Sequence, residues 1–124
     1  LRVVALPGAS SIALAVAASG LNGQSFAFVG YLPVEAGERS ERIRELESVS
    51  RRLAQTQVAI ETPYRNQALL AALVAQLQPT TVLSVSVGLT LTSESTRSTP
   101  VANWRAEPGS IATDVPAVFA WLAR

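Results

Sequence analysis

The chain lacks cysteine and histidine altogether, and its 10 basic residues are all arginine. Without cysteine, disulfides, thiolate zinc sites and a cysteine nucleophile are excluded, and without histidine the commonest metal ligand and general base are absent. Charged residues make up only 15% of the sequence and the formal net charge is +1, which argues against a broad basic face that wraps nucleic acid. Any chemistry therefore rests on binding, positioning, backbone groups and a few carboxylates.

Long apolar runs are also missing, although apolar residues make up 48% of the 124 residues. Serine and glycine interrupt the longest run well before the roughly 20 residues that a bilayer-spanning helix requires. No basic segment leads into an apolar one with a cleavage site of small residues, so no secretory signal peptide is predicted. We expect one compact cytoplasmic domain, and because the chain begins with Leu1 we interpret it as a piece of a longer protein.

The hydrophobic pattern predicts alternating strands and helices. Alternating or β-branched apolar residues predict strands at 2–6, 25–31, 56–60, 81–88 and 115–122. Helical spacing and capping signals predict helices from Ser10 or Ser11 to Gly20, over 35–52, and from Thr62 to Leu77. Residues 90–99 and 106–114 are predicted loops, and 100–105 a short strand or turn. The order predicts an α/β domain with a five-stranded, partly parallel sheet, flanked by helices and ending antiparallel.

The segment 35–52 holds ten of the chain's nineteen charged residues. Four apolar residues recur there at helical spacing and predict one buried stripe: Ile43, Leu46, Val49 and Leu53. The pairs Glu38–Arg42 and Glu47–Arg51 stand at the i,i+4 spacing that favours ion pairs. Because acids alternate with the arginines, a solvated helix face is favoured over a face that binds an anion or RNA phosphate.

Two polar motifs stand at predicted strand ends. In residues 6–11, exposed N–H groups, the hydroxyls of Ser10 and Ser11 and a helix start can hold a polar or anionic group. That segment has neither G-x-G-x-x-G nor G-K-[ST], so a plain turn with a serine cap is the alternative. In residues 60–66, Glu61, Tyr64 and Arg65 follow a strand, where ligand crevices of α/β sheets lie. The alternative is that Glu61 simply pairs with Arg65.

Thr62 and Pro63 between them predict where the following helix begins. Threonine is a favoured N-cap residue, and proline suits the first helical position because its missing N–H costs nothing there.

Four segments, in order along the chain, resemble the tetrapyrrole methylase superfamily, in the branch related to ribosomal RNA small subunit methyltransferase I. Residues 3–10 (VVALPGAS) resemble the branch's V-V-P-L-P-G-x-S/C-A, and residues 26–33 (FAFVGYLP) resemble F-x-F-x-G-F-L-P before a charged helix. Residues 60–65 (IETPYR) resemble Y-E-S-P-H-R, and residues 89–91 with Glu94 resemble E-L-T-K and its surroundings. Tyr64 replaces the histidine of the pattern, and the A-R-E before Leu89 is Ser-Val-Gly here, so fewer basic groups are available for RNA.

The resemblance implies two α/β domains with S-adenosyl-L-methionine held between them. It identifies residues 1–124 as the C-terminal domain, without the N-terminal cofactor domain. It implies that Tyr64 and Arg65 bind the substrate, and it assigns no catalytic residue and no metal. Carried over position by position, it implies cofactor contacts at Ser10, Ser11, Glu61, Thr62, Val87, Gly88, Pro116 and Ala117.

The expected function is therefore an S-adenosylmethionine-dependent methyltransferase, of which this chain lines the cofactor and substrate cleft. The acceptor is unknown, either ribosomal RNA or a small molecule, and the chain alone is expected to be inactive. Its expected partners are its own N-terminal domain and a second copy in a homodimer, with no membrane. The alternative is a non-enzymatic α/β interaction or ligand-sensing module that has kept the fold.

Overall fold

A computed structural model describes residues 25–87, 95–109 and 116–124 of the chain. The predicted strand at 2–6, the predicted helix ending at Gly20, the segment 89–94 and three predicted site residues lie outside the described residues. Those three are Ser10, Ser11 and Gly88.

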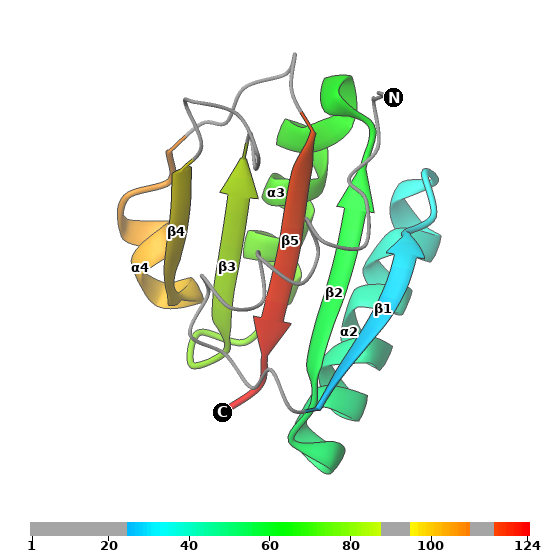
Figure 1. The fold of residues 1–124 in the computed structure, drawn as a ribbon, viewed down its shortest axis with the longest axis vertical. Coiled ribbons are helices and arrows are strands. Elements are labelled where there is room, and N and C mark those ends of the chain that lie inside the picture. The colour runs from blue at the N-terminus through cyan, green and yellow to red at the C-terminus, as the bar shows by residue number, and fades with distance from the viewer. Residues whose placement is uncertain (1–24, 88–94, 110–115) are drawn as a thin grey trace.

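A five-stranded sheet forms the centre of the described structure, in the order β1-β2-β5-β3-β4 (Figure 1). β1 and β2 are parallel, whereas β5 is antiparallel to both of its neighbours and β4 is antiparallel to β3. The predicted mixed, partly parallel sheet is thus confirmed, with its antiparallel part the larger one. The strands are β1 (Phe26–Tyr31), β2 (Thr56–Glu61), β3 (Val82–Val87), β4 (Ser95–Pro100) and β5 (Ala117–Leu122).

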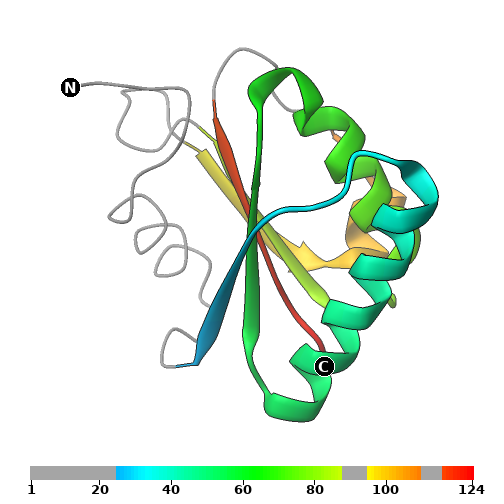
Figure 2. The ribbon, with the colours of Figure 1, turned by 90° about the vertical axis from the view of Figure 1, so that its right-hand side faces the viewer.

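The described helices all pack on one face of this sheet (Figure 2). They are α2 (Ala36–Leu53), the short 3₁₀ helix η1 (Pro63–Arg65), α3 (Asn66–Gln76) and α4 (Val101–Ala106). The main core lies between the sheet and these helices, where Phe119 and Trp121 of β5 and Leu69 and Leu73 of α3 are fully buried. Because β5 is the middle strand, all six of its residues are buried, which explains its unbroken apolar sequence.

A bulge in β1 controls which of its side chains share a face. Phe28 is in register with Val58, but Gly30 is in register with Ala59, so Val29 is the extra residue. Gly30 has φ of +73°, a conformation that residues with a Cβ adopt at a cost. The bulge therefore returns Tyr31 to the face of Phe26 and Phe28, and all three rings are exposed.

The end of α2 departs from the predicted apolar stripe. Ile43 and Leu46 are buried as predicted, but Leu53 is 53% exposed because the helix ends there. Ser50 makes the last contact of the helix with the sheet, and its hydroxyl oxygen accepts a hydrogen bond from the Ala123 N–H at 2.9 Å. The buried face of α2 is thus partly polar.

Both predicted ion pairs along α2 are wrong. Arg42 pairs with Glu45 instead of Glu38. Glu47 is buried, and its Oε2 accepts hydrogen bonds from the Gln78 N–H, at 2.8 Å, and from the Thr81 hydroxyl. Its carboxylate therefore joins α2 to the turn before β3 instead of pairing with Arg51.

The segment after residue 94 also differs from the prediction. Residues 95–100 form β4 instead of a loop, because their alternating exposed positions suit an outer strand that pairs with β3 on one side only. Residues 101–106 form α4 instead of a strand or turn. Val101 and Trp104, three residues apart and both buried, are the pattern that could have indicated this helix.

We predict that Glu47→Ala lowers the free energy of unfolding by about 1–3 kcal/mol, because it leaves the Gln78 N–H and the Thr81 hydroxyl without their acceptor. Glu47→Gln, which keeps an acceptor oxygen, should cost less. The matched control is Glu45→Ala, which removes an exposed ion pair and should change stability by less than about 0.5 kcal/mol. Urea denaturation measures all three, and equal losses for Glu45→Ala and Glu47→Ala would contradict the role given to Glu47.

A second prediction concerns the start of α2. The Glu35 carboxylate accepts hydrogen bonds from the Gly37 and Glu38 N–H groups at 3.0 and 2.8 Å. These bonds lower the pKa of Glu35 below its ordinary value of 4.5. The cap therefore stabilises α2 above pH 4.5 and is lost as the pH falls through the lowered pKa. The protection of the Gly37 and Glu38 amides from exchange, relative to their intrinsic rates at each pH, should fall below that pKa, and this pH dependence should vanish in Glu35→Gln.

Candidate functional site

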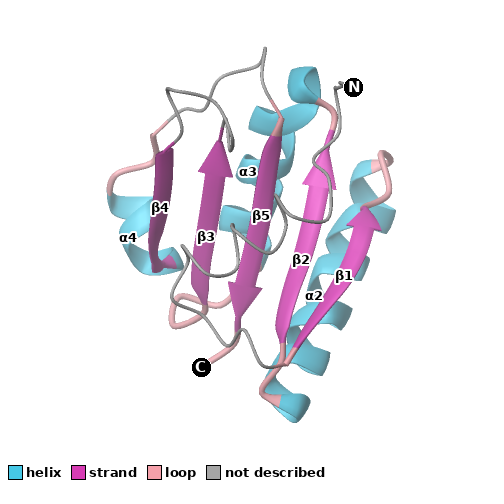
Figure 3. Ribbon diagram, viewed as in Figure 1, coloured by secondary structure: helices cyan, strands magenta, loops and turns pink. Residues whose placement is uncertain are grey.

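Three strand ends meet in one row at an edge of the sheet (Figure 3). β2 ends at Glu61, β3 ends at Val87, and the antiparallel β5 begins between them at Ala117. Ala117 is in register with both Glu61 and Val87, so the three residues lie side by side. We call this row, with the adjoining Thr62 and Pro116, the site edge. The described residues predicted to contact the cofactor therefore fall along a single edge.

The residues of the site edge differ in their exposure, and therefore in whether a ligand can contact their side chains. Side chains of directly paired residues share a face, and for Glu61, Ala117 and Val87 this is the face that packs against the helices. Glu61 and Ala117 are almost fully buried, whereas Val87, Thr62 and Pro116 are half-buried. A ligand at this edge would therefore contact Val87, Thr62 and Pro116 and the backbone of the row.

One oxygen of the Glu61 carboxylate holds the turn that follows β2. Its Oε1 accepts hydrogen bonds from the Thr62 N–H at 2.7 Å, the Thr62 hydroxyl at 3.3 Å and the Arg65 Nε at 3.3 Å. The Glu61–Arg65 ion pair, left open as the alternative to a ligand role, is therefore formed. Thr62 precedes η1 as predicted and Pro63 begins it, but the Thr62 hydroxyl donates to Glu61 and caps no helix N–H.

Tyr64 and Arg65 lie next to the site edge and are accessible. The Tyr64 side chain is 69% exposed, and the guanidinium carbon of Arg65 lies 4.8 Å from the centre of its ring, a cation–π contact. The Arg65 side chain is about one-third exposed. The structure thus brings Tyr64 and Arg65 together with Glu61 and Thr62, as the motif predicts, while their contact with a substrate stays a prediction.

A cavity of about 220 Å³ lies beside Val87, between β3, β4 and α4. Ser95 and Arg97 of β4 and Trp104 of α4 line it. Sequence reasoning missed these residues because it placed 95–99 in a loop and 100–105 in a short strand or turn. The β-branched Thr96 and Thr99 are the signal that could have indicated a strand.

Among the residues that the structure describes, no group of three or more histidine, cysteine, aspartate or glutamate side chains could hold a metal ion. Within the same ranges, no helix is both long enough and apolar enough to cross a bilayer.

No protein-family model matches the chain. Curated relatives in sequence include the ribosomal RNA small subunit methyltransferase I of Mesorhizobium japonicum, 36% identical over 78% of this chain and 32% of that protein. The protein of the same name from Neisseria meningitidis is 37% identical over 75% of this chain and 30% of its own length. That from Vibrio cholerae is 39% identical over 52% of this chain and 21% of its length. The chain thus spans between about a fifth and a third of the length of these relatives.

A solved structure shows the fold. The crystal structure of the methyltransferase CobJ matches 98% of this chain and 51% of its own, with a TM-score of 0.61 and 14% sequence identity. The chain has a tetrapyrrole-methylase-like fold. The resemblance drawn from the four sequence segments is therefore confirmed at the level of the fold, and the sequence relatives are those that the resemblance implied.

We predict that Glu61 stabilises this fold more than Arg65 does. Glu61→Ala removes the acceptor for three buried or half-buried donors and should cost about 1–3 kcal/mol in the free energy of unfolding. Arg65→Ala should cost less, because Thr62 still donates to the carboxylate and Arg65 is partly solvated. Chemical denaturation of both variants tests the order, and a larger loss for Arg65→Ala would reverse the assignment.

Proposed function

We propose that the protein containing this chain is an S-adenosylmethionine-dependent methyltransferase, and that this chain supplies one wall of its cofactor cleft. The observation that carries the proposal is the row of Glu61, Ala117 and Val87, since positions that the family resemblance implies as cofactor contacts lie side by side. Relatives in sequence named ribosomal RNA small subunit methyltransferase I support the activity.

The chemistry of the site edge fits part of such a cofactor. Val87 is apolar and half-buried and offers an apolar contact, while the half-buried Thr62 and Pro116 border the same row. The cavity beside Val87, at about 220 Å³, is below the usual 300–1,000 Å³ of a small-molecule site, so this chain supplies only part of a pocket. We therefore propose that an N-terminal domain supplies the rest, and that the chain alone binds cofactor weakly.

Bound S-adenosylmethionine supplies an activated methyl group on a sulfonium. The contribution of this chain is to bind and orient, because methyl transfer chiefly requires the acceptor to be aligned with that methyl group. Such a role needs no histidine or cysteine. It needs a rigid edge, and here the ladder pairing of β2, β5 and β3 together with the hydrogen bonds on Glu61 makes the row rigid.

We propose in addition that the whole protein is cytoplasmic and acts as a homodimer, as the resemblance implies. The names of its relatives suggest ribosomal RNA as the acceptor, and a small molecule is the alternative. In the latter case Tyr64 and Arg65 would contact the small molecule at the same edge.

We predict that Val87→Phe in the full-length protein weakens S-adenosylhomocysteine binding at least about tenfold, a loss of about 1.4 kcal/mol, by filling the space beside the site edge. Val82→Phe is the matched control, because Val82 is also half-buried but lies at the opposite end of the same strand. It should change the Kd less than about twofold.

Isothermal titration calorimetry with S-adenosylhomocysteine measures both variants and the unmodified protein. Equal effects of the two substitutions would remove the site edge from the cofactor site. If the unmodified full-length protein does not bind S-adenosylhomocysteine, the methyltransferase proposal fails and a non-enzymatic module takes its place.

A further inference from the structure

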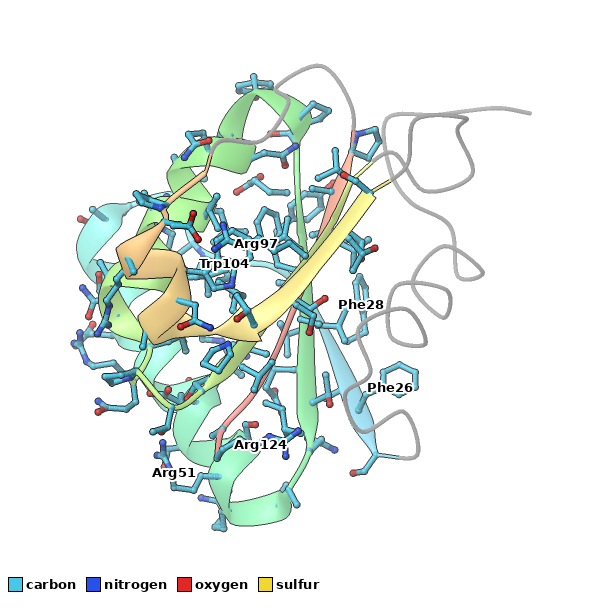
Figure 4. The ribbon with its side chains drawn as sticks, turned by 90° about the vertical axis from the view of Figure 1, so that its left-hand side faces the viewer. Phe26, Phe28, Arg51, Arg97, Trp104 and Arg124 are labelled. Carbon is cyan, nitrogen blue, oxygen red and sulfur yellow. The ribbon has the colours of Figure 1, made fainter. Side chains whose placement is uncertain are left out.

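Arg97 is held in a fixed position by contacts on several sides. Its side chain lies against Trp104 of α4 (Figure 4), with the guanidinium carbon 4.0 Å from the centre of the ring. Its Nη1 donates to the Glu107 carbonyl oxygen at 2.9 Å, and its Nη2 donates to the Asn103 carbonyl oxygen at 3.3 Å. A Cβ added at Gly109 would lie 3.4 Å from Nη1, so the chain also passes close to the guanidinium there.

No described carboxylate forms an ion pair with this guanidinium. The acceptors that Arg97 contacts are neutral backbone carbonyls, in contrast to Arg42 and Arg65, which pair with Glu45 and Glu61. A guanidinium carries five N–H donors, and only two hydrogen bonds from Arg97 are formed within the described residues. Among the described residues, the Arg97 guanidinium thus has a defined orientation and no anionic partner.

The pairing of β4 with β3 places Arg97 near the site edge. Arg97 is in register with Val85, and Ser95 is in register with Val87 of the site edge. All four residues line the cavity of about 220 Å³, together with Trp104. The cavity is partly open to solvent, so an anion can reach the guanidinium, and the protein on its other sides strengthens their interaction relative to bulk water.

We propose that this cavity, which we call the Arg97 cavity, binds an anionic oxygen group of a ligand at the site edge, either a carboxylate or a phosphate. A planar guanidinium matches both groups, since each offers two or more acceptor oxygens. The Ser95 hydroxyl at the cavity wall adds a neutral donor. The identification of the ligand as a cofactor or a methyl acceptor rests on the proposed function. The binding of an anion in this cavity does not depend on that function.

The test must separate anion binding from the structural contacts of Arg97 with α4. Ser95→Asp does so, because it places a negative charge at the cavity wall and substitutes neither Arg97 nor the residues that Arg97 contacts on α4 and at Glu107. Ser95→Asn is its uncharged control of the same shape. Arg97→Gln removes the guanidinium, and Arg44→Gln removes an arginine that contacts Gln76 on the exposed helix surface, far along the chain from the cavity.

Inorganic phosphate and acetate serve as probes, titrated into the full-length protein at constant ionic strength, with chloride as the balancing anion. The reporter is the indole N–H signal of Trp104 in ¹H–¹⁵N NMR spectra, assigned by its loss in Trp104→Phe. This N–H donates to the Leu83 carbonyl oxygen at 3.0 Å, so it has a fixed environment beside the cavity. The indole signal of Trp121, which is fully buried in the core, is the internal reference.

We expect phosphate or acetate to shift the Trp104 signal saturably, with a Kd of the order of millimolar, and to leave that of Trp121 unchanged. Ser95→Asp and Arg97→Gln should weaken this binding at least about tenfold, while Ser95→Asn and Arg44→Gln should change it less than about twofold. If the Trp104 signal does not respond, or if Ser95→Asp binds both anions as the unmodified protein does, the inference is overturned and Arg97 only holds the end of α4.

A second arm identifies the source of the anion. If Arg97→Gln and Ser95→Asp weaken the binding of S-adenosylhomocysteine but not of methylthioadenosine, which has no carboxylate, the cavity holds the cofactor carboxylate. If they change neither, the anion belongs to the acceptor. If the unmodified protein does not bind S-adenosylhomocysteine, the proposed function is disproved, but a measured phosphate site still stands. Failure of the proposed function and failure of the proposed anion site are therefore distinguishable.

Discussion

The position of β5 between β2 and β3 is the constraint on which the rest of the structure depends. β5 comes last along the chain, yet it forms hydrogen-bonded ladders with two strands that precede it and run in the opposite direction to it. This pairing makes the end of β2, the end of β3 and the start of β5 neighbours at one edge. It also buries every residue of β5, so the strand that aligns the site edge is also the centre of the hydrophobic core.

Buried polar groups connect the elements around this sheet. Glu47 joins α2 to the turn before β3, Ser50 joins α2 to the end of β5, and Glu61 closes the turn after β2. In each case a side-chain oxygen accepts a hydrogen bond from a backbone N–H, and that of Ala123 would otherwise be buried without a partner. Such contacts fix the relative positions of helices and strands more narrowly than apolar packing does, since they require direction as well as proximity.

Much of the fold was predictable from the sequence, and the exceptions share a cause. The periodic segments now seen as α2, α3, β1, β2, β3 and β5 were predicted within a few residues, because their patterns are strong. β4 was missed because it is an outer strand rich in serine and threonine that pairs on one side only. The exposure of Leu53 and the burial of Glu47 were predicted wrongly because burial along a helix depends on neighbours distant in sequence. Contacts between distant segments are not encoded in local periodicity.

For the site, the family resemblance named Glu61, Val87 and Ala117, and the register of β2, β5 and β3 places these three residues side by side. The sequence alone could not predict the Arg97 cavity, because the cavity forms only where β4 and α4 meet in the folded chain.

The position of β1 at the outside of the sheet also has a consequence. This strand is outermost among the described strands, it carries neither a charge nor a proline, and its bulge places the exposed Tyr31 on the same face as the exposed Phe26 and Phe28. Outer strands pair readily with other chains unless charges, prolines or bulges oppose it, and among the described residues of β1 the bulge at Val29 is the feature that does so.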